Sequence, residues 1–78
     1  MNMFNLSDGI NYYEMRILQS EEYGDQIIRK FKREYKYPDN PKHFLESLVA
    51  GMGLDSSDLT PSTIRRIENE INNYLRRY

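Results

Sequence analysis

Few residues of this sequence have the type and spacing that catalysis requires. It contains one histidine, His43, and no cysteine, which excludes a Cys–His pair, a disulfide and cysteine-ligated zinc within these 78 residues. A lone histidine beside Lys42 is far more common as a solvated side chain than as a general base. The sequence therefore predicts a protein that is not an enzyme, with no catalytic, cofactor-binding or metal-ligating residue and no cofactor.

Two groups of acidic residues are better explained by local structure than by chemistry. Glu21, Glu22 and Asp25 are predicted in the first turns of a helix, where the helix dipole favours the charged form of a carboxylate. General acid catalysis instead needs a desolvated carboxyl group. Asp55 and Asp58 lack the further oxygen ligands and the glycine of a calcium loop, so we expect them to cap a loop.

A basic stretch interleaved with aromatic residues, 29–37, is the feature that favours a function. It holds five positive charges and one negative charge in a chain whose net charge is −1. Basic side chains can pair with an acidic protein surface or neutralise phosphates, and tyrosine can anchor an interface or stack on a base. In the alternative interpretation, Phe31 and Tyr35 belong to the core and the basic side chains form a solvated helix face. The predicted partner-binding residues are Arg29, Lys30, Lys32, Arg33, Lys36 and Tyr37.

The tyrosine content favours a protein partner. Seven residues are tyrosine and none is tryptophan, and a core of this size cannot bury all seven rings. We expect Tyr12, Tyr37 and Tyr78 to be exposed, and exposed tyrosine and arginine are enriched at binding hot spots. The leading interpretation is a small protein-binding module, such as a regulator, an inhibitor or an accessory protein of a phage or mobile element.

Nucleic-acid binding is the alternative function, through the basic stretch or through the last helix. In a helix-turn-helix motif, the residues of that helix facing the groove would be Thr63, Arg65, Arg66 and Asn69. The segment 51–60 is more than twice as long as the turn of that motif. Glu68 and Glu70 would also repel phosphates. The sequence therefore favours a protein partner over DNA.

The elements that position these residues are predicted from four helix-start signals. Ser7, Ser20, Asn40 and Thr60 each precede a stretch with helical spacing of apolar residues, and proline follows the last two. Short polar side chains accept hydrogen bonds from the first N–H groups of a helix, and proline favours the first helical position. The predicted fold is all-α, a compact bundle of four short helices in a single small domain, 1–78.

The last three helices are predicted at Ser20–Tyr37, Pro41–Ala50 and from Pro61 onwards. The first of these places its apolar residues on one face and its basic residues on the other, and Pro38 ends it. The last carries a narrow apolar seam over 64–78, which suits one neighbouring helix or the same seam of a second copy in a homodimer. The expected core residues are Ile27, Phe31, Leu48, Ile67 and Ile71.

The first segment leaves two folds open. As a helix over about Asp8–Gln19, its apolar face is interrupted by Glu14. As a strand, it alternates Tyr13, Met15 and Ile17. The alternative fold is therefore α+β, with a hairpin of 10–18 and 26–37 followed by two helices.

The sequence gives no sign of export or of a membrane span. Its first residues lack the basic and apolar regions of a signal peptide. No run approaches the roughly 18 consecutive apolar residues that a span requires. We therefore expect a cytoplasmic protein.

Two sets of scattered residues resemble known proteins, although the chain is assigned to neither family. Tyr12-Tyr13, Asp25, Phe31, Tyr35, Tyr37-Pro38 and Phe44 resemble the small YozE-like proteins, which implies a SAM-type helical fold and no activity. Leu45-Glu46-Ser47 and Arg66-Ile67-Glu68-Asn69 resemble the end of a small type I-F anti-CRISPR protein. That resemblance implies an α+β inhibitor of a bacterial defence complex.

Overall fold

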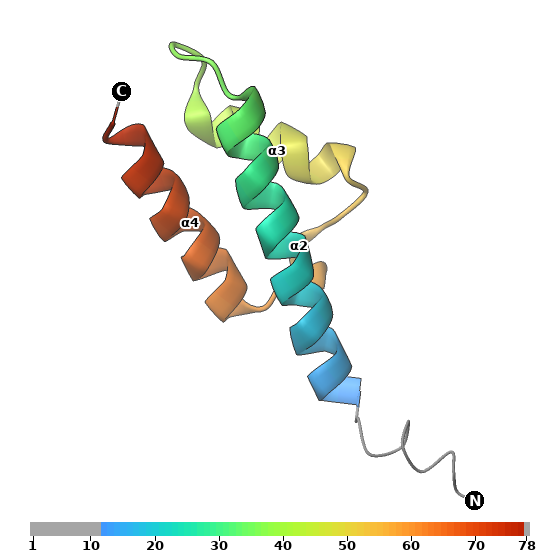
Figure 1. Cartoon of the computed structure of the whole chain (residues 1–78). Coiled ribbons are helices and arrows are strands. Elements are labelled where there is room, and N and C mark those ends of the chain that lie inside the picture. Colours follow the sequence, from blue (N-terminus) through green and yellow to red (C-terminus); the bar gives the residue numbers. More distant parts are fainter. Residues whose placement is uncertain (1–11, 78) are drawn as a thin grey trace, which may run out of the picture.

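The computed structural model describes residues 12–77, which form three α-helices and one short 3₁₀ helix. These residues contain no strand. The all-α class is therefore confirmed, with three helices in the described part where the sequence predicted four (Figure 1). The predicted cap Ser7 and the start of the predicted first helix lie outside the described residues.

A single helix, α2 (Tyr12–Glu34), replaces the predicted first two helices. Ser20 lies inside α2 and is fully buried, so its prediction as a helix cap was wrong. Its hydroxyl donates a hydrogen bond to Oγ1 of Thr63 (2.7 Å) and accepts one from the backbone N–H of Thr60 (2.8 Å). This serine therefore joins α2 to a distant segment. The hairpin alternative was also wrong, because residues 12–34 are continuously helical.

The other two predicted helices are confirmed as α3 (Pro41–Gly51) and α4 (Pro61–Leu75). Asn40 and Thr60 cap them as predicted. Each side chain accepts a hydrogen bond from the backbone N–H three residues further on, at 3.1 and 3.3 Å. Both helices begin with proline, whose missing N–H costs nothing at this position.

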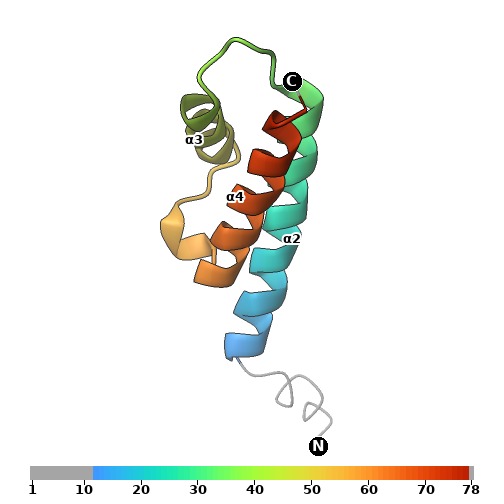
Figure 2. The ribbon, with the colours of Figure 1, turned by 90° about the vertical axis from the view of Figure 1, so that its left-hand side faces the viewer.

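The central element is α2, because α3, α4 and the 3₁₀ helix all contact it. In Figures 1 and 2, α2 and α4 lie side by side and run in the same direction. Gly24 allows their close approach: a Cβ atom there would lie 2.7 Å from Cγ2 of Thr63. The first turns of α2 extend beyond the start of α4.

The core lies between α2 and the two shorter helices. Four of the five predicted core residues are buried, and Leu48 is half-buried against them. The Phe31 ring is fully buried; it stacks on Tyr35 with ring centroids 4.9 Å apart and meets Phe44 edge-on at 5.5 Å. The buried core residues are Ile27, Ile28, Phe31, Tyr35, Ile67 and Ile71.

The 3₁₀ helix, η1 (Ser56–Asp58), is closed by the two aspartates that the sequence predicted as loop caps. The Asp55 carboxylate accepts a hydrogen bond from the backbone N–H of Ser57 (2.8 Å) and one from its hydroxyl. The Asp58 carboxylate accepts one from the backbone N–H of Asp55 (3.0 Å). This capping box fixes the connection that leads into α4.

We expect Asp55 to make the protein sensitive to acid. The hydrogen bonds from the hydroxyl and backbone of Ser57 lower the pKa of the Asp55 carboxyl group. The carboxylate therefore stabilises the folded state above its unfolded pKa of about 3.9, and this contribution is lost as the pH falls through the lowered folded pKa. Thermal unfolding midpoints measured below about pH 5 should fall less steeply for Asp55→Asn than for the wild type. For Ser57→Ala, the decrease of the midpoint with falling pH should be intermediate in steepness between those of Asp55→Asn and the wild type. Identical slopes for all three proteins would contradict the prediction.

Candidate partner-binding surface

The basic stretch 29–37 is divided between two structural environments. Residues 29–34 form the last turns of α2, and 35–37 begin the connection to α3. The backbone N–H of Tyr35 still bonds to the carbonyl of Phe31 (2.9 Å), after which the chain leaves the helix. The six predicted binding residues therefore do not share one helix face.

Tyr35 belongs to the core. Its side chain is 5% exposed and its hydroxyl donates a hydrogen bond to the backbone carbonyl of Asp39. Burial raises the pKa of this hydroxyl, and the negative charge of Asp39 adds to the shift. Tyr35 thus remains a neutral hydrogen-bond donor at physiological pH, in agreement with the interpretation that places Phe31 and Tyr35 in the core.

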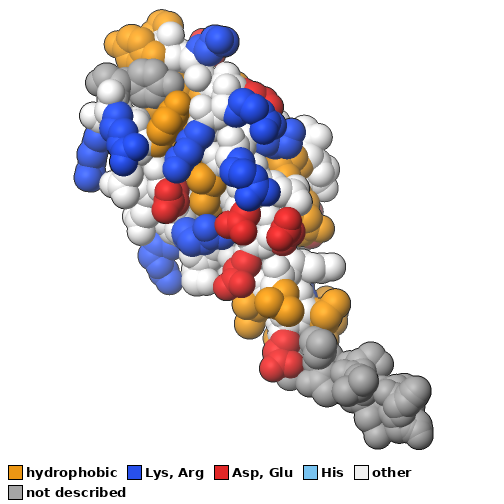
Figure 3. Space-filling model, viewed as in Figure 1, with side chains coloured by type: hydrophobic (Ala, Val, Ile, Leu, Met, Phe, Trp, Pro, Cys, Tyr) orange, Lys and Arg blue, Asp and Glu red, His pale blue; other side chains and the backbone are white. Residues whose placement is uncertain are grey.

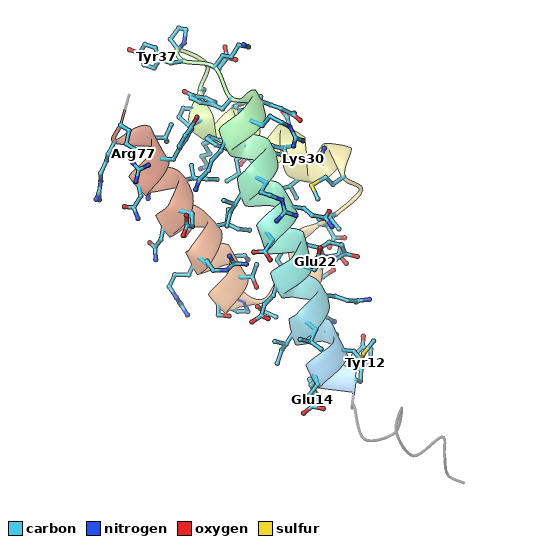
Figure 4. All side chains as sticks on the ribbon, in the orientation of Figure 1. Tyr12, Glu14, Glu22, Lys30, Tyr37 and Arg77 are labelled. Atoms are coloured by element: carbon cyan, nitrogen blue, oxygen red, sulfur yellow. The ribbon has the colours of Figure 1, made fainter. Side chains whose placement is uncertain are left out.

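The basic side chains on α2 point in different directions. Lys32 lies on the side of α4, where its Nζ is 3.3 Å from a carboxylate oxygen of Glu70. Lys30 is half-buried, whereas Arg29 and Arg33 are exposed and one turn apart. Figure 4 labels Lys30 along α2 and Tyr37 beyond the end of the helix. The residues brought together on the exposed side are therefore the two arginines.

Two of the five cations are neutralised by neighbouring carboxylates. Lys32 pairs with Glu70, and Arg33 pairs with Glu34 at 3.3 Å. Among residues 12–77, the other three cations of the stretch form no ion pair; they are Arg29, Lys30 and Lys36. Exposed ion pairs contribute little to stability, so Lys32 and Arg33 can exchange their carboxylates for those of an acidic partner.

Tyr37 stands at the edge of a groove at the basic end of α2. Its side chain is 72% exposed, as the sequence predicted. The groove has a volume of about 740 Å³ and separates the connection after α2 from the end of α4; it is lined by Tyr35, Tyr37, Pro38, Asp39, Asn40, Pro41 and Leu75. An apolar side chain of a partner could enter this groove beside the Tyr37 ring.

A second exposed surface, at the start of α2, was missed at the sequence level. It consists of apolar side chains that are between 45% and 75% exposed: Tyr12, Tyr13, Met15, Ile17 and Leu18. Tyr12 was predicted to be exposed, and Tyr78 lies outside the described residues. Figure 3 shows hydrophobic side chains at this end of the molecule. The sequence does contain a signal for this surface: the apolar residues of this segment are distributed around the helix and do not form one stripe. A single neighbouring helix cannot cover all of them.

The structure does not support a helix-turn-helix reading of α4. Thr63 is 2% exposed and therefore cannot reach a groove of DNA. The Arg66 guanidinium lies 2.9 Å from the Asp25 carboxylate and also donates a hydrogen bond to the carbonyl of Glu21 (3.2 Å). Arg65 and Asn69 are exposed and the Arg66 side chain is 41% exposed, so Thr63 is the member of the predicted groove-facing set that is buried.

The apolar seam of α4 is covered within the chain. Ile67 and Ile71 are 4% and 5% exposed. The Tyr74 hydroxyl donates a hydrogen bond to the backbone carbonyl of Lys32 (3.0 Å). Within the described residues, α2 already packs against this seam.

His43 is exposed in the first turn of α3. No group of three or more potential metal ligands gathers within 12–77. None of the helices in this part of the chain is long and apolar enough to cross a membrane.

Comparisons of the chain with protein-family models, with curated proteins and with solved structures gave no match. Neither resemblance noted in the sequence is therefore supported by a matching family. The α+β fold implied by the anti-CRISPR resemblance also disagrees with the all-helical structure of 12–77. The surface must be interpreted from its own residues.

Proposed function

We propose that the chain is a non-enzymatic protein-binding module of the regulator, inhibitor or accessory type, acting in the cytoplasm. Its contact surface is the basic end of α2 and the connection that follows, formed by Arg29, Lys30, Lys32, Arg33, Lys36 and Tyr37. The partner surface is acidic and offers an apolar side chain to the groove beside Tyr37.

The observation that carries this proposal is the position of Tyr37 at the groove, directly after Lys36 in the chain. Lys36 is exposed and forms no ion pair within the described residues. Tyr37 is largely exposed and lines the groove together with apolar and polar residues. Tyrosine is one of the residue types enriched at binding hot spots, and the positive charge of the adjacent Lys36 can steer an acidic partner towards it. Figure 3 shows blue side chains spread over this end of α2 and over α4.

We expect the double substitution Lys36→Glu/Tyr37→Ala to abolish capture of partner proteins by the immobilised chain. Both side chains are exposed, so the substitutions should leave the fold intact. The measurement is quantitative mass spectrometry of proteins retained from an extract of the source cells, with far-ultraviolet circular dichroism to verify the helices.

The matched control is Arg65→Glu, which reverses an exposed charge on α4 away from this surface. It should retain the same proteins as the wild type. Nuclease treatment before capture distinguishes the alternative function. If nuclease removes the captured material, and binding falls steeply and linearly with salt on a logarithmic plot, nucleic acid is the partner and the proposal is wrong. Capture by the double variant equal to that of the wild type would also contradict it.

A further inference from the structure

The acidic residue Glu22 does not cap a helix in its actual position. The sequence placed it at a helix start, but it lies near the middle of α2, and the helix dipole acts only on the first and last turns. Glu22 accepts a hydrogen bond from Gln26 at 3.4 Å and forms no ion pair within 12–77. Its charge is therefore available to a partner.

Glu22 lies on a continuous exposed side of α2, which we call the outer face. Its members are spaced three or four residues apart, which places them on one side of a helix; they are Met15, Leu18, Glu22, Gln26, Arg29 and Arg33. All except the half-buried Gln26 are exposed. The buried side of α2, with Ile27 and Phe31, faces the opposite way. At one end of the outer face, Met15 lines a pocket together with Ser57 and Asp58 of η1.

Along the outer face, from the start of α2 to its end, the side chains are first apolar, then acidic and then basic. Met15 and Leu18 are apolar, Glu22 is acidic, and Arg29 and Arg33 are basic. Glu22 and Arg29 lie two turns apart, about 10.5 Å along the axis, so they cannot pair within their own helix. Figure 3 shows acidic side chains over the middle of α2 and basic ones above them.

In a second copy of α2 that runs in the opposite direction, basic residues lie opposite the acidic residue of the first copy. With the two-fold axis beside residues 25 and 26, Glu22 of each copy lies opposite Arg29 of the other. The same alignment places Leu18 opposite Arg33, whose aliphatic stem can cover an apolar side chain. A parallel copy in register would instead set Glu22 against Glu22 and Arg29 against Arg29, which is unfavourable.

We infer that the outer face of α2 is a self-docking surface, through which two copies of the chain form an antiparallel two-fold dimer. Arg29 and Arg33 also belong to the surface proposed above, but the dimer goes beyond that function and does not depend on the groove beside Tyr37. The face from Met15 to Arg33 is about 27 Å long. A contact of this length lies near the lower limit of specific interfaces, about 1,000 Å², so the dimer is weak and sensitive to salt.

Charge exchange tests this dimer. Sedimentation velocity of the full chain, from about 1 μM to about 1 mM at low salt, should give a monomer–dimer equilibrium. Glu22→Arg or Arg29→Glu should each weaken the dimer by about tenfold or more, because each places like charges opposite one another twice. The double variant Glu22→Arg/Arg29→Glu restores both pairs and should return the dissociation constant to within about threefold of the wild type. Arg65→Glu is the control and should leave the dimer unchanged.

Three results would overturn the inference: a monomer at every concentration, a dimer unaffected by either single reversal, or a double variant that stays monomeric. Its failure can be separated from failure of the proposed function, because Lys36 and Tyr37 lie outside the outer face. A monomeric chain that still loses protein capture with Lys36→Glu/Tyr37→Ala overturns the dimer alone. A dimer that obeys the charge exchange, together with capture unaffected by that variant, supports the inference and contradicts the proposed function.

Discussion

Replacing Phe31 with alanine is expected to remove about 3–5 kcal/mol of folding free energy. The ring is 0% exposed and its neighbours include three aromatic rings, those of Tyr35, Phe44 and Tyr74. Its loss would leave a cavity where α2 meets both shorter helices. Because domains are stabilised by only about 5–15 kcal/mol, this single change should bring the protein close to unfolding.

The measurement is urea denaturation followed by circular dichroism, comparing Phe31→Ala with Phe31→Leu and the wild type. The leucine variant should keep a clear unfolding transition at a reduced midpoint, even if the alanine variant is unfolded without denaturant. Tyr37→Ala removes an aromatic ring that is 72% exposed and serves as the matched control, with an expected change within about 0.5 kcal/mol. A Phe31→Ala protein as stable as this control would show that the ring does not hold the helices together.

The second large effect is expected from Gly24→Ala, which should destabilise the protein although alanine favours helices. Alanine in a helix interior gains about 1 kcal/mol over glycine. At this position, however, the new Cβ would lie 2.7 Å from Cγ2 of Thr63 and 3.1 Å from Nη2 of Arg66. Forcing α2 and α4 apart typically costs about 1–3 kcal/mol. We therefore expect a net loss of stability, measured as a lower urea midpoint.

A double-mutant cycle identifies the cause of that loss. Thr63→Ser removes Cγ2 but keeps the hydroxyl that accepts the hydrogen bond from Ser20. It should recover at least about half of the stability lost in Gly24→Ala. Gly51→Ala is the matched control, because a Cβ at Gly51, the last residue of α3, meets no atom within 4 Å. Equal effects at both glycines would mean that close packing of α2 and α4 is not the reason.

The predictions from sequence succeeded where the signal was local. The starts of α3 and α4 depend on a cap residue and the proline after it, and both lie within a few residues of the bonds they make. Ser20 gave the same local signal and was misread, because its hydrogen-bond partners lie 40 and 43 residues further along the chain. No window of neighbouring residues contains that information.

The candidate site shows the same division between local and distant causes. The exposure of Tyr37 follows from its place beside Pro38 in a turn, which the sequence displays. The ion pair of Lys32 does not, because its partner, Glu70, lies 38 residues away in the sequence. The exposed position of Glu22 in mid-helix became visible only once the predicted helix start at Ser20 had been replaced by one continuous helix.

The parallel arrangement of α2 and α4 has a consequence for how the chain acquires its structure. The side-chain hydrogen bonds between these helices connect residues 38 to 45 positions apart. A loop of that length must close before any of them forms, and contacts between distant residues slow folding. During synthesis, α2 leaves the ribosome well before α4. The core face of α2, with Ile27 and Phe31, therefore stays exposed to solvent until α4 has been synthesised and can cover it.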